Sequence, residues 1–220
     1  MTKARVVETN QGIQGEFDVS KYDLMQRRLR DKGWIETNDI IKSGIRTGMV
    51  LEVGPGPGYL GLEWLKNTEN TTLKGLDISP EMIKIAERNA GEYGLSDRVE
   101  YMVSSGDTMP FENNMFDAVF TNGSLHEWEN PKETFGEMWR VLKTGGRIFI
   151  SDLKRDVNIF IRLFLLTVTK PKEIRPGLIT SINAAYTAGE LREMIWDTQL
   201  SGCSVSANPI GVTITGVKQE

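Results

Sequence analysis

The chain has 220 residues, of which 39% are hydrophobic, and this is enough to bury the core of one large α/β domain. Its net charge of −4 gives no overall attraction to nucleic acid, and its single cysteine excludes both an internal disulfide and a cysteine cluster for a metal. No stretch reaches the roughly 18 apolar residues that a membrane-spanning helix needs, and the N-terminus lacks the apolar segment of a secretory signal. We therefore expect a single cytoplasmic domain over residues 1–220, without metal and without stable membrane insertion.

Residues 1–45 are predicted to form an N-terminal cap made of helices. Residues 1–17 carry no periodic pattern, so no regular element is expected there. Ser20 and Asp23 predict the start of a helix. A second helix is expected to end at Gly44. The apolar positions of the two helices are Leu24, Met25 and Leu29 in the first and Ile35, Ile40 and Ile41 in the second.

Residues 46–152 show short apolar runs separated by helical stretches, which is typical of βαβ units with a mostly parallel sheet. Strands are predicted at 49–53, 72–76, 99–103, 116–121 and 147–152. Ser79 before Pro80 and Asn130 before Pro131 predict helix starts, with Glu133 as a capping-box acid in the second helix. That second helix is expected to end at 144–146, where the sequence is Thr-Gly-Gly.

Residues 153–186 form an insertion whose first part is apolar but interrupted by Arg162. It is interpreted as a helix that packs on the domain or in a homodimer, as a lid over an apolar acceptor, or as a membrane-surface helix. In residues 187–220, Thr187 and Glu190 predict a capping box, and a turn at 208–209 joins two final strands. The elements together predict a Rossmann-like, mostly parallel seven-stranded sheet with helices on both faces and an antiparallel C-terminal strand.

A glycine-rich segment, Glu-Val-Gly-Pro-Gly-Pro-Gly at 52–58, lies between a predicted buried strand and a predicted helix. Glycines allow close approach of a ligand, and ligands of open α/β sheets bind at the carboxyl ends of strands. A dinucleotide fingerprint needs a third glycine where the chain has Tyr59, and a P-loop needs a following Gly-Lys-Ser or Gly-Lys-Thr that is absent. The spacing G-x-G-x-G therefore indicates a nucleotide-like cofactor of another kind.

Two acidic residues follow the next two predicted strands. Asp77 ends the second strand, where a carboxylate can accept hydrogen bonds from both hydroxyls of a ribose. Ser79 is the better helix cap, so Asp77 is expected to be free for a ligand. Asp107 follows the third strand. Three polar sites at three successive strand ends are more specific than any one of them.

These features resemble class I S-adenosylmethionine-dependent methyltransferases of the small-molecule branch, including the ubiquinone/menaquinone type. The resemblance covers about residues 48–152 and includes the segment 116–152. It implies S-adenosylmethionine as cofactor and a small-molecule methyl acceptor. The DNA-methylating Asn-Pro-Pro-Tyr motif is absent, since 121–124 reads Thr-Asn-Gly-Ser. The implied cofactor contacts are Glu52, Gly54, Gly56 and Gly58 for the methionine end, Asp77 and Ile78 for the ribose, Asp107, Gly106 and Thr108 for the adenine, and Asn122, Gly123 and Leu125 near the methyl group.

His126 is the only histidine and lies just after the fourth strand, near the expected methyl group, where it could remove a proton from the acceptor. The alternative is that His126 only packs or hydrogen-bonds in the loop. Acceptor contacts are also predicted for Tyr22, Glu127, Trp128 and Arg155, although Trp128 could equally anchor the core. Two other functions are weighed: a cofactor-binding module without turnover, which the intact loop and acids disfavour, and an NAD-dependent oxidoreductase, which the glycine spacing disfavours.

Overall fold

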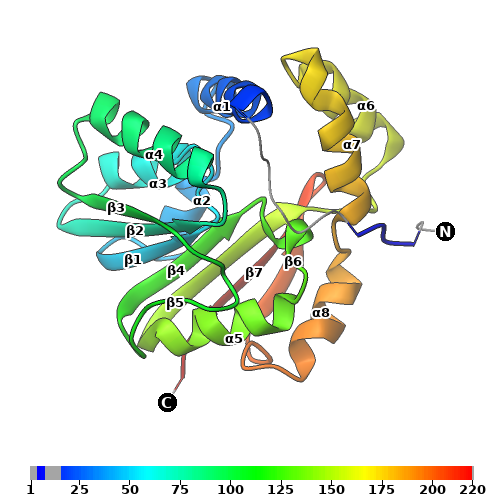
Figure 1. The fold of residues 1–220 in the computed structure, drawn as a ribbon. Coiled ribbons are helices and arrows are strands. Elements are labelled where there is room, and N and C mark those ends of the chain that lie inside the picture. The colour runs from blue at the N-terminus through cyan, green and yellow to red at the C-terminus, as the bar shows by residue number, and fades with distance from the viewer. Residues whose placement is uncertain (1–3, 8–15, 220) are drawn as a thin grey trace.

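The computed structural model describes residues 4–7 and 16–219, and in this part of the chain seven strands form a sheet in the order β3-β2-β1-β4-β5-β7-β6 (Figure 1). Strands β1 to β5 pair in parallel, while β7 runs antiparallel to β5 and β6. This confirms the predicted fold class. The strands are β1 (Gly48–Val53), β2 (Thr71–Asp77), β3 (Val99–Val103), β4 (Phe116–Asn122), β5 (Leu142–Leu153), β6 (Ser204–Ala207) and β7 (Gly211–Val217).

Helices cover both faces of the sheet, because successive side chains of a buried strand point to opposite faces. Val50 of β1 packs in one core cluster with Trp64 of α3 (Tyr59–Lys66). Its neighbour Leu51 packs in the other cluster with Phe135 of α5 (Pro131–Val141) and Leu191 of α8 (Ala188–Trp196). Figure 1 shows α3 and α4 (Pro80–Tyr93) above the sheet and α5 and α8 below it.

The predicted helix starts have mixed outcomes. Ser79 caps α4 by accepting a hydrogen bond from the Met82 backbone N–H, and Thr187 forms the predicted capping box with Glu190. The prediction at Asn130 is wrong in part: Pro131 does begin α5, but the Asn130 side chain makes no capping hydrogen bond.

The prediction for the end of α5 is wrong. The helix ends at Val141, and Leu142 already pairs with Phe116 as the first residue of β5. Phe116 of β4 pairs with Leu142, but Ala118 pairs with Arg147, so the register shifts between Phe116 and Ala118. The additional residues of β5 include the Thr-Gly-Gly segment, with Gly145 at φ 78°, and form an irregularity within the strand. The glycines therefore mark a bulge in a strand and not the end of a helix.

Helix α1 (Glu16–Asp31) begins four residues before Ser20, so the predicted start at Ser20 is wrong. The predicted lack of structure over residues 1–17 fails at 16 and 17 and otherwise lies largely outside the described residues. The short helix α2 (Thr37–Lys42) contains buried Ile40, and Gly44 follows it with φ 96°, close to the predicted end. Ile35 precedes this helix instead of lying in it.

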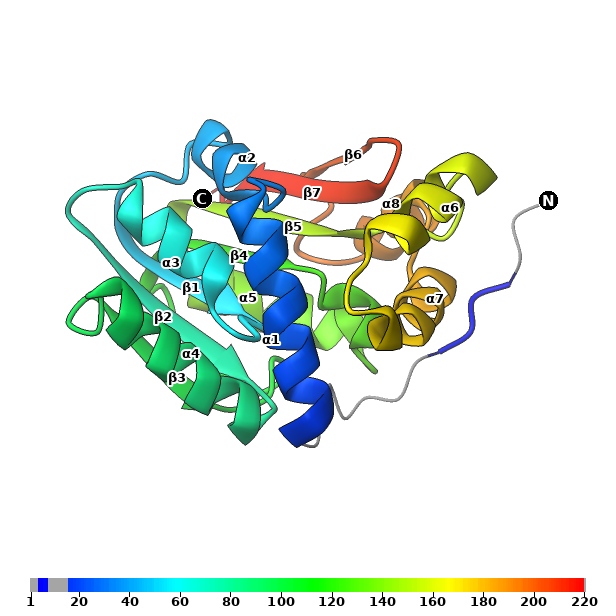
Figure 2. The ribbon, with the colours of Figure 1, turned by 90° about the horizontal axis from the view of Figure 1, so that it is seen from above.

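Three helices lie beyond the carboxyl ends of the parallel strands. Helix α1 contacts α3, α4 and the 3-10 turn Lys172–Ile174. That turn connects α6 (Ile159–Val168) to α7 (Arg175–Ala184), the two helices of the insertion. Figures 1 and 2 show α1 between the α3–α4 side of the molecule and the α6–α7 pair. No helix among the described residues is long and apolar enough to cross a membrane.

Candidate active site

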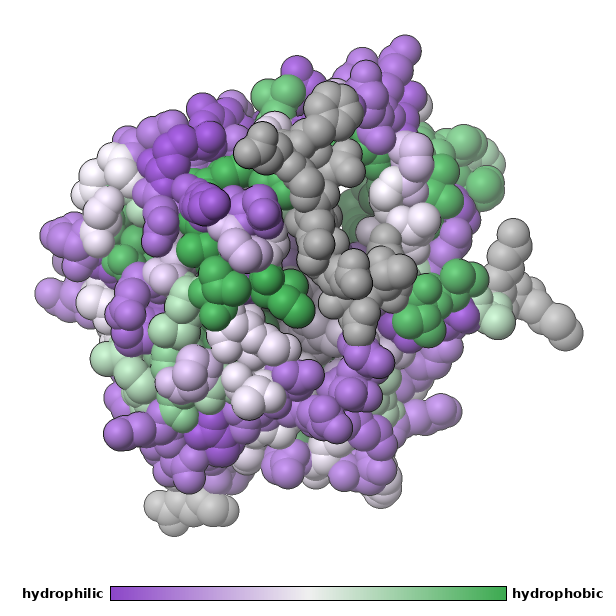
Figure 3. All heavy atoms as spheres, viewed as in Figure 1, coloured by the Kyte–Doolittle hydropathy of each residue, from purple (hydrophilic) through white to green (hydrophobic). Residues whose placement is uncertain are grey.

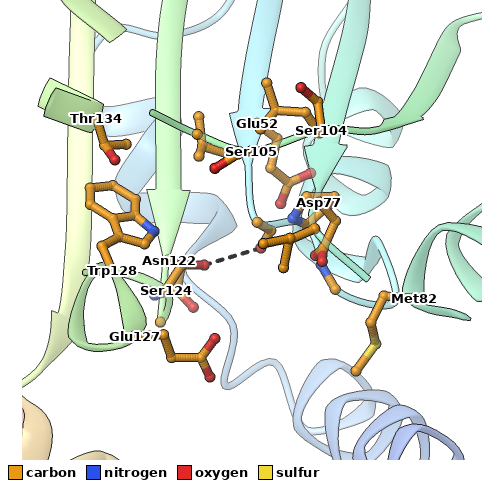
Figure 4. A pocket seen from close by; sticks show the side chains of 18 of the residues that line it. Glu52, Asp77, Met82, Ser104, Ser105, Asn122, Ser124, Glu127, Trp128 and Thr134 are labelled. Carbon is orange, nitrogen blue, oxygen red and sulfur yellow. Dashed lines mark hydrogen bonds between the residues drawn. The ribbon is translucent and has the colours of Figure 1, made fainter. Parts of the chain in front are cut away.

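A polar cavity lies where the parallel strands end. The carboxyl ends of β1, β2 and β4 bring Glu52, Asp77 and Asn122 to the same edge of the sheet. The cavity has a volume of about 200 Å³. Figure 4 shows Glu52 and Asp77 on one side of it and Trp128 on the other. This cavity lies where the sequence predicts a ligand site, while the binding of a ligand there stays a prediction.

The glycine loop at 54–58 is held by backbone conformations that only glycine adopts without strain. Gly54, Gly56 and Gly58 have φ values of 69°, 53° and 82°. A Cβ atom on Gly54 would lie 2.2 Å from the Ser124 Oγ, whose hydroxyl lies 3.3 Å from the Gly54 carbonyl. Gly58 faces away from the cavity: a Cβ there would lie 2.6 Å from the Tyr101 hydroxyl. Gly54 and Gly56 therefore shape the cavity, while Gly58 allows the loop to pack against the sheet.

Glu52 is a carboxyl group without a full set of partners. Its side chain is buried, and its Oε2 has no hydrogen-bond partner among the described residues. Burial and the neighbouring Asp77 raise the pKa of Glu52 to about 8. A buried oxygen of this kind carries a desolvation cost that a cationic or hydrogen-bonding ligand would remove.

Asp77 is not free, contrary to the prediction. Its Oδ2 accepts a hydrogen bond from the Gly56 backbone N–H at 2.9 Å, and its Oδ1 accepts one from the Ser79 backbone N–H at 2.9 Å. Burial raises the pKa of Asp77 although these hydrogen bonds oppose the rise. The carboxylate therefore ties the glycine loop to the start of α4 and still lines the cavity.

The remaining cofactor residues divide into two groups. Ile78, Gly106, Asp107 and the pair Asn122 and Gly123 line the polar cavity. Two predicted residues do not line it: Thr108 is exposed, with its hydroxyl 3.2 Å from the Asp107 carboxylate, and Leu125 is buried in the core beneath the sheet. The prediction that Leu125 lines the cofactor site is therefore wrong, because its side chain fills the α5 side of the core.

A second cavity of about 1,050 Å³ adjoins the first. Its walls come largely from apolar residues of α1, α6 and α7, including Met25, Ile161 and Leu165. Five residues line both cavities, namely Tyr22, Gln26, Asn122, Gly123 and Glu127. A ligand in the polar cavity would therefore meet a ligand in the large cavity at these residues.

His126 lies on the wall of the large cavity and is paired with Asp152 near the end of β5. The His126 Nδ1 lies 2.9 Å from both oxygens of Asp152, and Asp152 Oδ2 also accepts the His126 backbone N–H at 2.7 Å. The opposite nitrogen, Nε2, lies 3.8 Å from Glu127 Oε1. Because a carboxylate oxygen accepts hydrogen bonds, the pairing with Asp152 favours the tautomer with the proton on Nδ1.

The predicted acceptor residues are distributed unevenly. Tyr22 and Glu127 line both cavities, and burial followed by the Glu127 charge raises the pKa of the Tyr22 hydroxyl. Trp128 lines the polar cavity and packs edge-on against Phe135 at 5.9 Å, so it serves the core as well.

Arg155 lines neither cavity. Its side chain is buried in an ion pair with Glu190 and hydrogen-bonds the Ala185 carbonyl. The prediction that it contacts the acceptor is therefore wrong, since the guanidinium is used to fix the start of α8.

The sequence interpretation missed Gln26, Glu36 and Asp152, which line the large cavity. Asp152 stands at the end of a predicted strand, as Asp77 does, and this position could have drawn attention to it. Gln26 lies four residues after Tyr22, one helical turn along α1. Nothing local distinguishes Glu36, which reaches the cavity only through the packing of the N-terminal region on the strand ends.

A family model described as a methyltransferase domain matches residues 51–150. The chain is 30% identical over 174 residues to the demethylmenaquinone methyltransferase of Deinococcus radiodurans, and the match covers 76% of this chain and 70% of that protein. The chain belongs to the S-adenosylmethionine-dependent methyltransferases, within the ubiquinone/menaquinone type. The resemblance seen in the sequence is thereby confirmed, and S-adenosylmethionine is the cofactor of the family.

Two further relatives place this methyltransferase among known proteins. It is 34% identical over 131 residues to an uncharacterized protein of Methanocaldococcus jannaschii, a match that spans 56% of this chain and 57% of that protein. A solved S-adenosylmethionine-dependent methyltransferase from Aquifex aeolicus has a TM-score of 0.68 at 22% identity, over 92% of this chain and 98% of that one. The likeness to the latter is one of fold.

The polar groups that line the polar cavity fit this cofactor. The orphaned Glu52 Oε2 suits the ammonium group of a methionine moiety, and the Asp77 carboxylate suits a pair of hydroxyls. The glycine loop is not followed by the Gly-Lys-Ser or Gly-Lys-Thr of a phosphate-binding P-loop, and this suits a cofactor that has no phosphate. No cluster of three or more metal-ligating side chains occurs among the described residues.

Proposed function

We propose that this methyltransferase transfers a methyl group to a ring carbon of an apolar, hydroxylated acceptor of the quinol class. The observation that carries the proposal is the meeting of a polar cavity with a large apolar one at five shared residues. A polar cofactor and an apolar acceptor would each find matching walls, with their reacting atoms at the boundary. Close approach in line is the main requirement of methyl transfer.

The cofactor would be held by residues of this chain at both of its ends. We assign the methionine ammonium to Glu52, the ribose hydroxyls to Asp77 and the adenine amino group to Asp107. When bound, S-adenosylmethionine supplies an electrophilic methyl carbon on a positively charged sulfur. Asn122 and Gly123 line both cavities and would lie beside that methyl group.

The acceptor class is supported by chemistry and by the relatives. The Deinococcus radiodurans relative is a demethylmenaquinone methyltransferase. A quinone ring carbon becomes a good nucleophile when the ring is reduced to the hydroquinone, and better still when a hydroxyl loses its proton. The apolar walls contributed by α6 and α7 suit a ring with an aliphatic tail.

His126 is proposed as the base. With its Nδ1 proton held by Asp152, His126 can accept the proton of an acceptor hydroxyl on Nε2. The ring carbon then forms a bond to the methyl carbon, the sulfur–methyl bond breaks, and its electron pair stays on sulfur. The methylated carbon then loses its hydrogen as a proton to solvent, and His126 returns its proton to the ring oxygen, which restores the aromatic quinol.

The test is methyl transfer from labelled S-adenosylmethionine to reduced demethylmenaquinone with a short isoprenoid tail. Wild-type protein should form the methylated quinol, and His126→Ala should lower kcat by about 100-fold or more with unchanged affinity for S-adenosylhomocysteine. Thr180→Ala, an exposed change on α7, is the control and should retain the rate. Absence of product with the wild-type protein, or a full rate in His126→Ala, would contradict the acceptor class or the base, respectively.

A further inference from the structure

Glu36 is a carboxyl group of which the fold satisfies only one part: hydrogen bonding with Ser151 and Asn122 holds it, while one of its oxygens has no partner among the described residues. It is the residue before α2, yet its side chain makes no capping hydrogen bond to that helix. Its Oε2 is buried from solvent and has no hydrogen-bond partner among the described residues. Leaving a carboxyl oxygen buried without a partner costs stability, so such a group calls for a ligand.

The surroundings of Glu36 place it at the boundary of the two cavities. Glu36 lines the large apolar cavity, and its carboxyl group lies near Ser151 and Asn122. Asn122 lines both cavities and donates a hydrogen bond to the Ser151 Oγ at 2.9 Å. Burial raises the pKa of Glu36, while hydrogen bonding with Ser151 and Asn122 opposes the rise and the charges of Asp39 and Asp152 add to it. The carboxyl group therefore stands beside the residue expected to flank the methyl group.

We propose that Glu36 accepts a hydrogen bond from a hydroxyl group of the acceptor and so determines which acceptor atom faces the cofactor. This assignment rests on the proposed function, because it takes the apolar cavity to be the acceptor site. Among the polar side chains at this end of the large cavity, the acceptor would meet His126 after β4 and Glu36 before α2, which come from separate elements. Farther from this polar end the walls on α1, α6 and α7 are largely apolar, so hydrogen bonding at His126 and Glu36 would orient a ring that the apolar walls alone would not.

The test measures binding in place of turnover, using 2-naphthol and naphthalene as probes with the cofactor site filled by S-adenosylhomocysteine. The two probes differ by one hydroxyl. Wild-type protein should bind 2-naphthol about tenfold more tightly, the range of a hydrogen bond to a charged group. Glu36→Ala should reduce the preference to about twofold, and Glu36→Gln, which keeps the size and an accepting oxygen, to about threefold.

The matched control is Asp39→Asn, which removes one negative charge three residues after Glu36, at an exposed position of α2 paired only weakly with Lys42. It should keep the tenfold preference. Unchanged affinity for S-adenosylhomocysteine and an unchanged melting temperature show that each variant is folded. A wild-type preference below twofold, or a preference that survives in both Glu36 variants, would overturn the assignment.

The result of this binding test is independent of the result of the methyl-transfer test. A hydroxyl preference that depends on Glu36, together with no methylation of reduced demethylmenaquinone, would refute the quinol acceptor and keep the Glu36 assignment. Methylation without such a preference would refute Glu36 and keep the acceptor.

Discussion

The two cavities of this methyltransferase are built from different kinds of structure. The polar cavity, which is the proposed cofactor cavity, is formed by loops at strand ends, where glycines at positive φ and backbone hydrogen bonds accepted by Asp77 fix the backbone. The large cavity, which is the proposed acceptor cavity, is formed largely by side chains of α1, α6 and α7, and α6 has no buried residue. Figure 3 shows apolar atoms on the outer side of the α6–α7 region, where Phe160 is 76% exposed. One site depends on backbone geometry and the other on side-chain packing, so changes in them should affect different measurements.

The largest expected effect is on the cofactor cavity. Gly54→Val should lower the affinity for S-adenosylhomocysteine by more than 100-fold, because a Cβ at this positive φ would lie 2.2 Å from the Ser124 Oγ. Isothermal titration calorimetry checks this. Gly94→Val is the matched control, since Gly94 also has positive φ, 66°, but nothing lies within 4 Å of its Cβ position. It should lose stability and keep its affinity, and equal losses of affinity in both variants would contradict the prediction.

A smaller effect should appear with pH in the same cavity. Glu52 has its pKa raised to about 8 in the cofactor-free protein, so it is mostly protonated at pH 7 and must lose a proton to pair with an ammonium group. Affinity for S-adenosylmethionine should rise by up to about tenfold between pH 6 and 7, with close to one proton released. Calorimetry in two buffers of different ionisation enthalpy measures that proton.

The stability of the cofactor-free protein should change in the opposite direction. A carboxyl group whose folded pKa is raised stabilises the fold below its unfolded pKa, and that stability is lost as the pH rises through about 8. The melting temperature of the cofactor-free wild-type protein should therefore fall as the pH rises towards 8. In Glu52→Gln this fall should be smaller, and the release of a proton on cofactor binding should disappear. Proton release that persists in this variant would assign it to another group.

The smallest expected effect is on the acceptor cavity. Leu165→Ser removes an apolar side chain from its wall and should raise the KM for the acceptor about fivefold, with unchanged affinity for the cofactor. Leu166→Ser is the matched control, since Leu166 is the next residue of α6, is also half-buried and does not line the cavity. Equal KM values for both variants would mean that α6 does not contact the acceptor.

The same contrast explains what the sequence could and could not predict. The five parallel strands and the glycine loop were predictable because apolar runs and glycine spacing act locally. The bulge at Gly145 was missed because a Thr-Gly-Gly segment suits a helix end as well as an irregular strand. The bridging role of Asp77 was missed because its partner, the Gly56 N–H, lies 21 residues away.

The acceptor cavity was the least predictable part. Its walls come from segments far apart in the chain, joined only by packing, such as Met25 of α1 and Leu178 of α7. The insertion was open to several interpretations, since an apolar helix can pack, dimerise or cover a ligand. The structure places it on the wall of the cavity, while its role in dimer formation stays a prediction. Glu36 had no local signal at all, because its environment is set by residues more than 80 positions away, among them Asn122.

The five residues common to both cavities also bear on the order of events in a catalytic cycle. Since Asn122, Gly123 and their neighbours face both spaces, a bound cofactor would itself become the inner wall of the acceptor cavity. If the acceptor bound first, this inner wall would be absent, and the acceptor could extend into the polar cavity, where its ring would not be in position for methyl transfer. We therefore expect compulsory-order kinetics, in which S-adenosylmethionine binds first and S-adenosylhomocysteine leaves last.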